Sequence, residues 1–447
     1  MYCLQMKKIN ILLFIICLLI SLQTYSQEEF IRPPAKFITK FSFTQLTGGI
    51  VIVKGLLDDI PDSLNFILDT GSSGISLDST TVEELHLFRQ KSNFTVKGIG
   101  GIRNVDFTYN HTLHFPNLPV EKLDFHINDY ELLSNIYGIR IDGIIGASFF
   151  KRYIVKIDYD HFIVEIFSIG YIKYPKGGYI VHPTFQSLPA SKQHIKDLEE
   201  VEGNFIIDCG AGLNALLSQD FIDEHFNLAK DKKIFTTLND GVGGKKRMNL
   251  TVIQSIQFGP YRFKKVPIYI FDDETNITDY PLYGGLIGND IMRRFNVILN
   301  YADGVFYFKP NMHFIDRFDY SYIGFNLYVI NGEIKVMDII TGSPGDKAGL
   351  KNEDILLGME TTAESLYEPN TAANSENDLK NNTNKVLVYD SKLNEIKNQS
   401  NRVYIGKDIQ VYKNVLQNAG LTIKLFILRN KMPLEFKLKI RNILRRK

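Results

Sequence analysis

Cysteine is scarce in this chain, with three in 447 residues. Cys3 and Cys17 lie in an N-terminal segment that we expect to be removed, and Cys209 would then remain alone. A mature chain with one cysteine can form no internal disulfide. A hydrophobic core must therefore hold the fold, which is feasible for a chain of this length.

An excess of charge of either sign is also absent, because the formal net charge at pH 7 is +1. Nothing in this balance favours a strongly charged partner. We therefore expect no binding of nucleic acid.

Several motifs of metal, cofactor and serine-hydrolase chemistry are missing. The chain has no His-Glu-x-x-His stretch, which would indicate a metal site, and no Gly-x-Ser-x-Gly stretch, which would indicate a serine nucleophile. The cluster Gly98-Ile99-Gly100-Gly101 has neither the spacing nor the lysine of a phosphate-binding loop. We expect no metal and no cofactor.

The longest N-terminal apolar run, Ile11 to Ile20, is short. A membrane-spanning helix needs about 20 apolar residues. Lys7 and Lys8 precede the run and polar residues follow it, which is typical of a signal peptide cut near Ser26. We expect residues 1–26 to be removed and the protein to be exported, to the periplasm or cell envelope, with no stable membrane span. An uncleaved anchor is the alternative.

Two segments of the chain resemble each other. Leu64 to Ser73 and Gly203 to Gly212 each consist of an apolar strand that ends in Asp, one small residue and Gly. The carboxylates are Asp69 and Asp208. An apolar strand that ends by presenting a carboxylate on a glycine turn indicates that the carboxylate has an acid–base role.

The resemblance continues downstream of each Asp. A glycine cluster follows in both copies, Gly98 to Gly101 and Gly241 to Gly244. Next come the elements Ile144-Ile145-Gly146 and Leu286-Ile287-Gly288, in the same order and at a near-constant interval. A duplication is the economical explanation.

The pattern inside each copy is mostly that of β-strands. We expect short helices over 79–88 and 218–226, with Ser218 as an N-cap. The expected organisation is all-β: one lobe over 27–172, a second over 173–315 and a third unit over 316–447. Residues 361–401 are rich in Asn, Ser, Thr and Glu, which favours a long, partly disordered insertion.

Paired carboxylates on facing loops can share one proton, because two like charges at close range cannot both ionise cheaply. The ionised group can take a proton from a bound water, while the protonated group donates to the carbonyl under attack. Asp69 and Asp208 are therefore candidates for a catalytic pair that activates water.

These motifs resemble those of the retropepsin-like aspartic proteases, over roughly residues 40 to 310. Asp69-Thr70-Gly71-Ser72 matches the active-site signature, and the two glycine clusters resemble the tips of flaps that close over substrate. The resemblance implies a bilobal acid-protease fold in one chain, as in pepsin-type enzymes, and a monomeric endopeptidase acting on peptides or proteins. The second copy departs from the pattern, since Cys209 stands where Thr or Ser is expected and Ala211 where Ser is common.

The resemblance assigns roles to particular residues. Asp69 and Asp208 would be catalytic. Residues that support the active-site loops would be Thr70, Gly71, Ser72, Cys209, Gly210 and Ala211. Residues of the flaps and of substrate binding would be Gly98, Ile99, Gly100, Gly101, Gly241, Val242, Gly243 and Gly244. Because a thiol is a poorer hydrogen-bond partner than a hydroxyl, we expect the contact between the loops to be weaker or asymmetric.

The third unit is similar to a bacterial PDZ domain, an α+β fold. Ser343 to Lys351 and the following Asp354-Ile355-Leu356 carry the likeness, together with Tyr322-Ile323-Gly324-Phe325. The resemblance implies that Ile323, Gly324 and Phe325 bind a peptide C-terminus. It also implies a helix over 408–417 and closing strands over 422–428 and 434–440.

Two other functions remain open from the sequence. The lobes could be a catalytically silent scaffold that binds peptides, which Cys209 and Ala211 favour. Cysteine-dependent chemistry at Cys209 is the second alternative, although no histidine lies near it in the sequence. The sequence leaves open the substrate, the cleavage preference and the working pH.

Overall fold

A computed structural model describes residues 32–98, 101–186, 188–241, 244–272, 283–318, 320, 322–362, 401–404 and 406–444. The chain divides into two compact units, one of residues 1–35 with 170–173 and one of the remainder. In the first, Pro34 and Tyr171 form a parallel bridge. The expected signal peptide lies outside the described residues. Everything below concerns the second unit.

The first repeat folds into a barrel-like sheet. Its strand order is β2-β3-β4-β10-β5-β9-β8, and a further pairing of β3 with β8 closes it. β10 runs parallel to β4 and antiparallel to β5. The strands are β2 (Thr44–Gln45), β3 (Val51–Leu57), β4 (Ser63–Leu68), β5 (Ile75–Asp78), β8 (Asp106–Phe115), β9 (Leu118–Asn128) and β10 (Gly143–Ile145).

The second repeat has the same topology, with one further strand at its edge. Its order is β14-β15-β16-β21-β17-β20-β19-β18, closed by β15 with β19, and β21 is parallel to β16 and antiparallel to β17. The strands are β14 (Thr184–Phe185), β15 (Pro189–Lys196), β16 (Glu200–Ile207), β17 (Ala215–Ser218), β18 (Phe235–Gly241), β19 (Gly244–Phe258), β20 (Tyr261–Phe271) and β21 (Gly285–Ile287). The internal duplication predicted from the sequence is confirmed.

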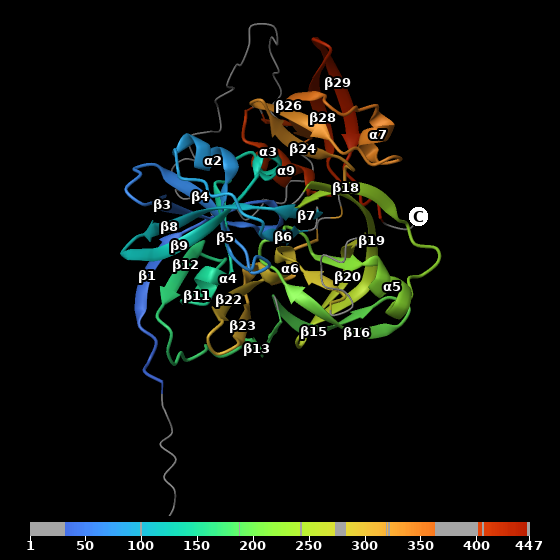
Figure 1. Ribbon diagram of the computed structural model, residues 1–447. Helices are drawn as coiled ribbons and strands as arrows, with labels where there is room; N and C mark the ends of the chain where they lie inside the picture. The colour runs from blue at the N-terminus through green and yellow to red at the C-terminus, as the bar shows by residue number, and fades with distance from the viewer. Residues whose placement is uncertain are drawn as a thin grey trace, which may run out of the picture. The chain divides into compact units, whose positions relative to one another are not determined.

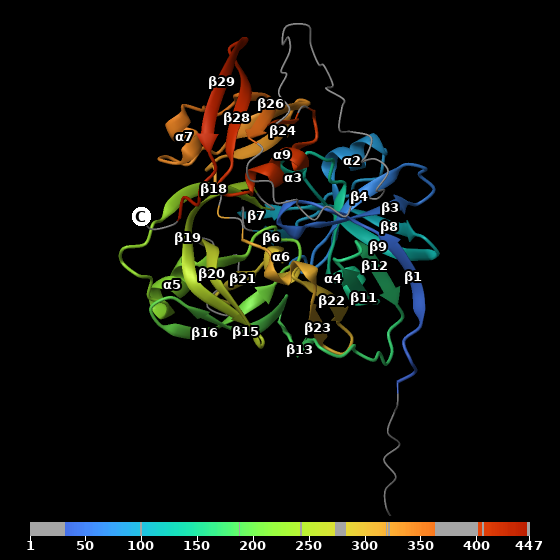
Figure 2. The same cartoon turned by 180° about the vertical axis from the view of Figure 1, so that it is seen from behind.

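A six-stranded antiparallel sheet joins the two lobes in the order β1-β12-β11-β22-β23-β13. Its central pair, β11 with β22, brings together one strand from each repeat, and Figures 1 and 2 show these strands side by side. One continuous apolar core contains buried residues of both lobes. The strands are β1 (Phe37–Ser42), β11 (Ile154–Asp158), β12 (Ile163–Phe167), β13 (Tyr179–Val181), β22 (Phe295–Asn300) and β23 (Val305–Pro310).

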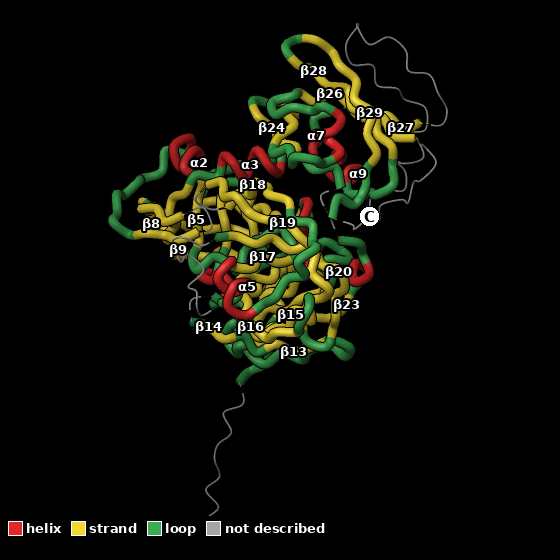
Figure 3. The backbone as a smooth tube through the Cα atoms, turned by 90° about the vertical axis from the view of Figure 1, so that its right-hand side faces the viewer, coloured by secondary structure: helices red, strands yellow, loops and turns green. Residues whose placement is uncertain are grey.

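Helices in the lobes are short, and strands dominate (Figure 3). The helix expected over 79–88 is shorter, because His86 adopts a left-handed φ of 53°. The helix expected over 218–226 is confirmed, and the Ser218 hydroxyl accepts from the Phe221 amide. The helices are η1 (Thr47–Gly49), α2 (Ser79–Glu84), α3 (Glu131–Tyr137), α4 (Ala147–Phe150), α5 (Gln219–His225), α6 (Asn289–Met292) and η2 (Met312–Ile315).

The C-terminal domain has an apolar core of its own, around Val336, Ile427 and Ile440. Its sheet has the order β24-β25-β26-β28-β29, with β27 on β26. The elements are β24 (Asn326–Ile330), β25 (Glu333–Met337), α7 (Pro344–Ala348), β26 (Ile355–Thr362), β27 (Asn401–Tyr404), α9 (Ile409–Leu416), β28 (Thr422–Arg429) and β29 (Met432–Lys439).

This domain confirms the expected helix over 408–417 and the two expected closing strands. Most of the insertion predicted over 361–401 lies outside the described residues, but its two ends belong to strands β26 and β27. The predicted boundaries at 172/173 and 315/316 stay predictions. Within the described part of the chain, no helix is long and apolar enough to cross a membrane.

Candidate active site

The two Asp turns lie at the ends of equivalent strands. β4 leads into Asp69 and β16 into Asp208. The amide of Asp69 donates to Ile145 O at 2.9 Å, and the amide of Asp208 donates to Ile287 O at 3.0 Å. The apolar–apolar–Gly elements predicted from the sequence are β10 and β21, and they hold both carboxylate-bearing residues in the same way.

The glycine of each turn lies directly against the carboxylate of the other turn. A Cβ built on Gly71 would be 2.4 Å from Asp208 Oδ2, and a Cβ on Gly210 would be 2.2 Å from Asp69 Cγ. Real Cβ atoms essentially never come this close. The glycines are therefore required by the approach of the two carboxylates, and the predicted juxtaposition of Asp69 and Asp208 is present.

The two carboxyl groups share a hydrogen bond. Burial, the charge of Asp208 and this hydrogen bond raise the pKa of Asp69 well above its usual value. Burial also raises the pKa of Asp208, although Asp69 and the amides of Gly210 and Ala211 oppose the shift by hydrogen bonding. The pair therefore holds one proton between its two carboxyls.

Reciprocal hydrogen bonds tie the two turns together behind the carboxylates. Thr70 Oγ1 accepts from the Cys209 amide at 3.0 Å and donates to Ile207 O at 2.7 Å. Cys209 Sγ accepts from the Thr70 amide at 3.4 Å and donates to Leu68 O at 3.3 Å. The expected asymmetry is confirmed: cysteine keeps both contacts, but its two are the longer ones, as its larger sulfur requires.

Cys209 is fully buried. Burial, together with the charge of Asp69, raises the pKa of its thiol far above the usual value. A nucleophilic cysteine needs a lowered pKa and access to substrate. This environment suppresses the thiolate and argues against the cysteine-dependent alternative.

The supporting glycines pack beneath the turns. A Cβ on Gly146 would be 2.4 Å from Ser72 O, and one on Gly288 would be 2.8 Å from Ala211 O. The Ala147 amide donates to Ser72 O, and the Asn289 amide donates to Ala211 O. Ser72 and Ala211 thus support their loops through backbone carbonyls, which explains why alanine can replace serine in the second copy.

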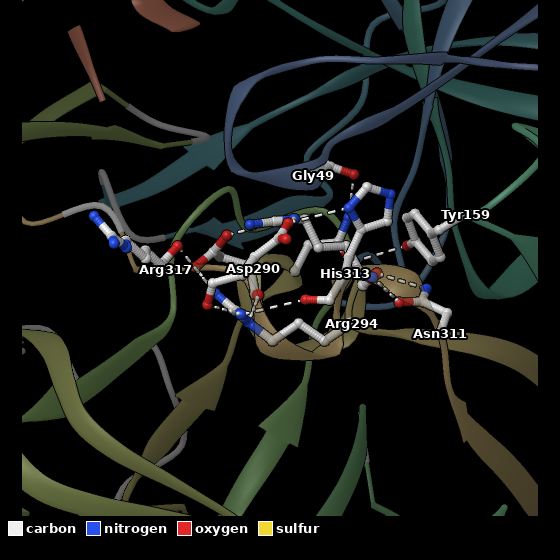
Figure 4. Close-up of polar contacts among 10 residues, drawn as sticks. Gly49, Tyr159, Asp290, Arg294, Asn311, His313 and Arg317 are labelled. Carbon is white, nitrogen blue, oxygen red and sulfur yellow. Dashed lines mark hydrogen bonds and ion pairs between the residues drawn. The ribbon is translucent and has the colours of Figure 1, made fainter. Parts of the chain in front are cut away.

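An ion-pair network anchors α6, the helix beneath the second turn (Figure 4). Arg294 is fully buried and bonds to Asp290 at 3.3 Å and to the Asp316 carbonyl at 2.6 Å. Burial by itself would raise the pKa of Asp290. The positive charges and hydrogen bonds of Arg293 and Arg294 outweigh this effect and lower the pKa below its usual value. Tyr159 and Gly49 bond to Asn289, so the first lobe reaches the same helix.

Both glycine clusters form the ends of β-hairpins. Gly98 pairs with Gly101 in the hairpin of β6 (Thr95–Gly98) and β7 (Gly101–Asn104), and Gly241 pairs with Gly244 between β18 and β19. The central residues Ile99, Gly100, Val242 and Gly243 lie outside the described residues. The hairpin placement agrees with a flap, whereas the role of these residues stays a prediction.

The loop expected to bind a peptide C-terminus precedes β24. Ile323 and Phe325 are buried, and Gly324 adopts a φ of 71°. A Cβ on Gly324 would be 2.1 Å from Ser343 Cβ, so glycine is required there.

Tyr137 was not singled out by the sequence. It ends α3, and its hydroxyl lies 3.1 Å from where a Cβ of Gly212 would be, in the turn that follows Asp208. Burial and the charges of Asp208 and Asp69 raise the pKa of this hydroxyl. The sequence offers no local signal for its role, because its place beside the second Asp turn depends on tertiary packing. Among the described residues, no group of three or more His, Cys, Asp or Glu side chains could hold a metal.

A family model for aspartyl proteases matches this chain twice. The matches cover residues 53–149 and 195–291. Each contains one Asp turn, one glycine hairpin and one apolar–apolar–Gly strand. No curated protein matches the chain. The two tandem matches and the two barrel-like lobes together show a protease-like fold.

Proposed function

We propose that this protein is an aspartic endopeptidase that hydrolyses peptide bonds with a water molecule activated between Asp69 and Asp208. One observation carries the proposal: the glycine of each turn is packed on the opposite carboxylate, so that the two carboxyls share a proton. The family match supports the same activity.

One carboxyl of the pair is ionised and the other is protonated. The ionised carboxylate takes a proton from the water as the water oxygen attacks the carbonyl carbon of the scissile bond. The protonated carboxyl donates to the carbonyl oxygen, and a tetrahedral diol forms without a covalent link to the protein. The first carboxyl then gives its proton to the amide nitrogen, the second takes one from a diol hydroxyl, and the C–N bond breaks to leave a carboxylic acid and an amine. The hydrogen bonds of Thr70 and Cys209 keep the carboxylates in place during these steps.

The substrate is proposed to bind as an extended strand beneath the two hairpins that end at Gly98–Gly101 and Gly241–Gly244. Backbone hydrogen bonds would supply affinity, and alternate side chains would enter apolar sites. Buried apolar clusters flank both turns, one including Ile50, Ile67 and Ile144 and the other including Ile206, Leu216 and Leu286. The partly buried residues packed against these clusters, Tyr137 on one and Leu213 on the other, would form such apolar sites.

The test compares the wild-type protein with Asp69→Asn on an unfolded protein such as reduced casein, across acidic and neutral pH. We expect cleavage by the wild type, inhibition by a pepstatin-type compound, and a loss of at least about 1,000-fold in kcat for the variant, since a carboxylate pair acts as a unit. Thr80→Ala, on α2, serves as a control outside the pair. Equal cleavage by Asp69→Asn would refute the mechanism, and binding without cleavage by the wild type would favour the silent scaffold.

The C-terminal domain is proposed to be PDZ-like. Its edge strand β24 follows the loop at Ile323–Phe325 and lies beside α9. In PDZ domains a peptide adds as a strand to such an edge. Binding of a peptide with a free C-terminal carboxylate, and not of its amidated form, is the expected result.

Export to the periplasm or cell envelope is proposed from residues 1–26. N-terminal sequencing of the mature protein should begin near residue 27. The lobes supply both carboxylates from one chain, so a monomer is expected to be active. Sedimentation of the active protein checks this.

A further inference from the structure

The short helix α3 depends on its neighbours. It has seven residues, each at least partly exposed, and its N-cap residue Tyr130 makes no side-chain capping bond. Isolated helices shorter than about 12–15 residues are marginal in water. Its position, which sets Tyr137 beside the second Asp turn, must therefore be fixed by the elements packed around it.

Side chains of the C-terminal domain donate hydrogen bonds to the last carbonyls of α3. Gln410 Nε2 donates to Tyr137 O at 2.9 Å, and Lys413 Nζ donates to Ile136 O at 2.5 Å. The last carbonyls of a helix lack partners within it, so these two bonds act as a cap supplied by α9. Gly138 ends the helix with a φ of 69°, and a Cβ there would be 2.3 Å from Ile409 Cγ2. α9 therefore closes directly over the helix end.

Gln410 also holds a second element of the first lobe. Its Oε1 accepts from the Thr47 amide at 3.1 Å and from the Thr47 hydroxyl at 2.8 Å. Thr47 begins η1, and a Cβ on the next residue, Gly48, would be 2.3 Å from Gly212 O. Both elements bound by Gln410 thus meet the turn that follows Asp208, one through Gly48 and one through Tyr137.

We propose that Gln410 is a positioning residue of the active site, and that through it the C-terminal domain forms part of the catalytic unit. The proposal rests on the proposed protease function and adds a structural determinant of its specificity. Loss of Gln410 would break its bonds to η1 and to α3 together, leave the end of α3 with the Lys413 bond, and weaken the placement of the Tyr137 hydroxyl at Gly212.

The contacts of α3 also show which segment of the chain lies against β24 and α9. α3 packs against β24, and Val329 Cγ2 and Ile409 Cγ2 both lie close to Gly138. The occupant of this part of the C-terminal domain is therefore the end of α3 from the same chain. A free peptide would have to displace it.

The first experiment measures hydrogen exchange in the full-length protein and does not require activity. In Gln410→Ala, the Gly138 amide, which donates to Ser134 O, should exchange on the order of 10-fold faster. Asn414→Ala is the matched control, because Asn414 is an exposed residue of the same helix. Unchanged exchange in Gln410→Ala, or an equal increase in both variants, would overturn the proposal.

The second experiment measures specificity. Two peptides that differ only in Leu or Ala beside the scissile bond compete in one reaction, so the ratio of their kcat/KM values is independent of how much protein is folded. We expect Gln410→Ala to change this ratio about 3-fold or more and to lower kcat on the order of 10-fold. Gln410→Glu keeps the acceptor for Thr47 but loses the donor to Tyr137, and should give a smaller change in the same direction. A ratio equal to that of Asn414→Ala would overturn the proposal.

A substitution that creates a steric clash tests the contact between α3 and α9 without removing Gln410. Gly138→Ala should change the cleavage ratio, because its Cβ would collide with Ile409. Gly349→Ala is matched to it, since Gly349 also ends a helix at a left-handed φ, 87°, but its Cβ would meet no atom closer than 3.8 Å. Equal effects of the two substitutions would contradict the proposal. If the wild type cleaves neither peptide, the proposed function fails, and the exchange experiment still decides the role of Gln410.

Discussion

The hydrogen bonds between Thr70 and Cys209 should contribute unequally to stability, which substitution can measure. Thr70→Val keeps the volume of the side chain but removes its hydroxyl. The buried Cys209 amide then has no partner in place of its 3.0 Å bond, and Ile207 O loses a bond of 2.7 Å. A buried polar group left unpaired costs about 1–3 kcal/mol. We therefore expect Thr70→Val to lower the free energy of unfolding by about 2–4 kcal/mol.

Cys209→Ala removes the weaker pair. The hydrogen bonds of Cys209 Sγ to the Thr70 amide and to Leu68 O measure 3.4 and 3.3 Å, and a thiol is a weak donor and acceptor. The expected loss is about 1–2 kcal/mol, including the small cavity left by the sulfur atom. Cys209→Ser restores a hydroxyl and should cost less than Cys209→Ala.

The assay is urea unfolding followed by circular dichroism, with the slope m required to stay constant so that midpoints report stability. Thr70→Ser is the control, because it keeps the hydroxyl and loses only a methyl group, worth about 1 kcal/mol. The reasoning is refuted if Cys209→Ala destabilises the protein as much as Thr70→Val, or if Thr70→Ser does. In either case the hydroxyl would not be the stronger half of the contact.

Three further predictions concern charge. The pKa of the Asp208 carboxyl is raised, so the folded protein binds more protons than the unfolded chain above about pH 4 and loses stability as pH rises. Asp208→Asn should therefore raise Tm more at pH 7 than at pH 4, and an equal change at both would contradict this. Burial lowers the pKa of His126 to about 4, so the unfolded chain binds a proton at this histidine more readily than the folded protein does. The resulting contribution to the free energy of unfolding is present above pH 6.5 and is lost as pH falls toward 4. His126→Gln should remove about 3 kcal/mol of that acid destabilisation in urea titrations at several pH values. Arg294→Met leaves Asp290 without one of its cations and should cost about 3–5 kcal/mol, whereas Arg152→Met, at the equivalent but exposed position, should cost under about 1 kcal/mol. Similar losses for the two arginines in urea unfolding would show that burial is not the cause.

The sequence predicts the parts of the site that local chemistry repeats. The Asp–x–Gly turns, the glycine hairpins and the apolar–apolar–Gly strands all recur in order. The glycines of the Asp turns and of the apolar–apolar–Gly elements are needed for a close approach that leaves no room for a Cβ. The capping serine of α5 was predictable for the same reason, because an N-cap is a local interaction.

Contacts that depend on tertiary packing could not be predicted in this way. Nothing local distinguishes Gln410 from the other polar residues of the partly buried helix α9, and nothing in the sequence near Tyr137 sets it apart from an ordinary helix end. Their roles come from segments far apart in sequence that meet in space, as the bond between Gln410 and Thr47 does. Arg152 and Arg294 occupy equivalent positions in the repeat, yet only Arg294 is fully buried, because the chain after β23 passes over it.

The two halves of the site are alike at the carboxylates and differ in what supports them. Beneath the second turn, Arg294 bonds to the carbonyl of Asp316, in the segment that leads to the C-terminal domain. Beside the same turn, Gln410 of that domain fixes both η1 and α3. The C-terminal domain is thus tied to the Asp208 side by two independent routes, one through the chain that enters it and one through α9. Since both carboxyls act in the proposed mechanism, a displacement of this domain should disturb the Asp208 half of the pair before it disturbs the Asp69 half. Combined substitution of Arg294 and Gln410 should therefore lower kcat by more than the product of the single effects, because each route alone can still hold the turn.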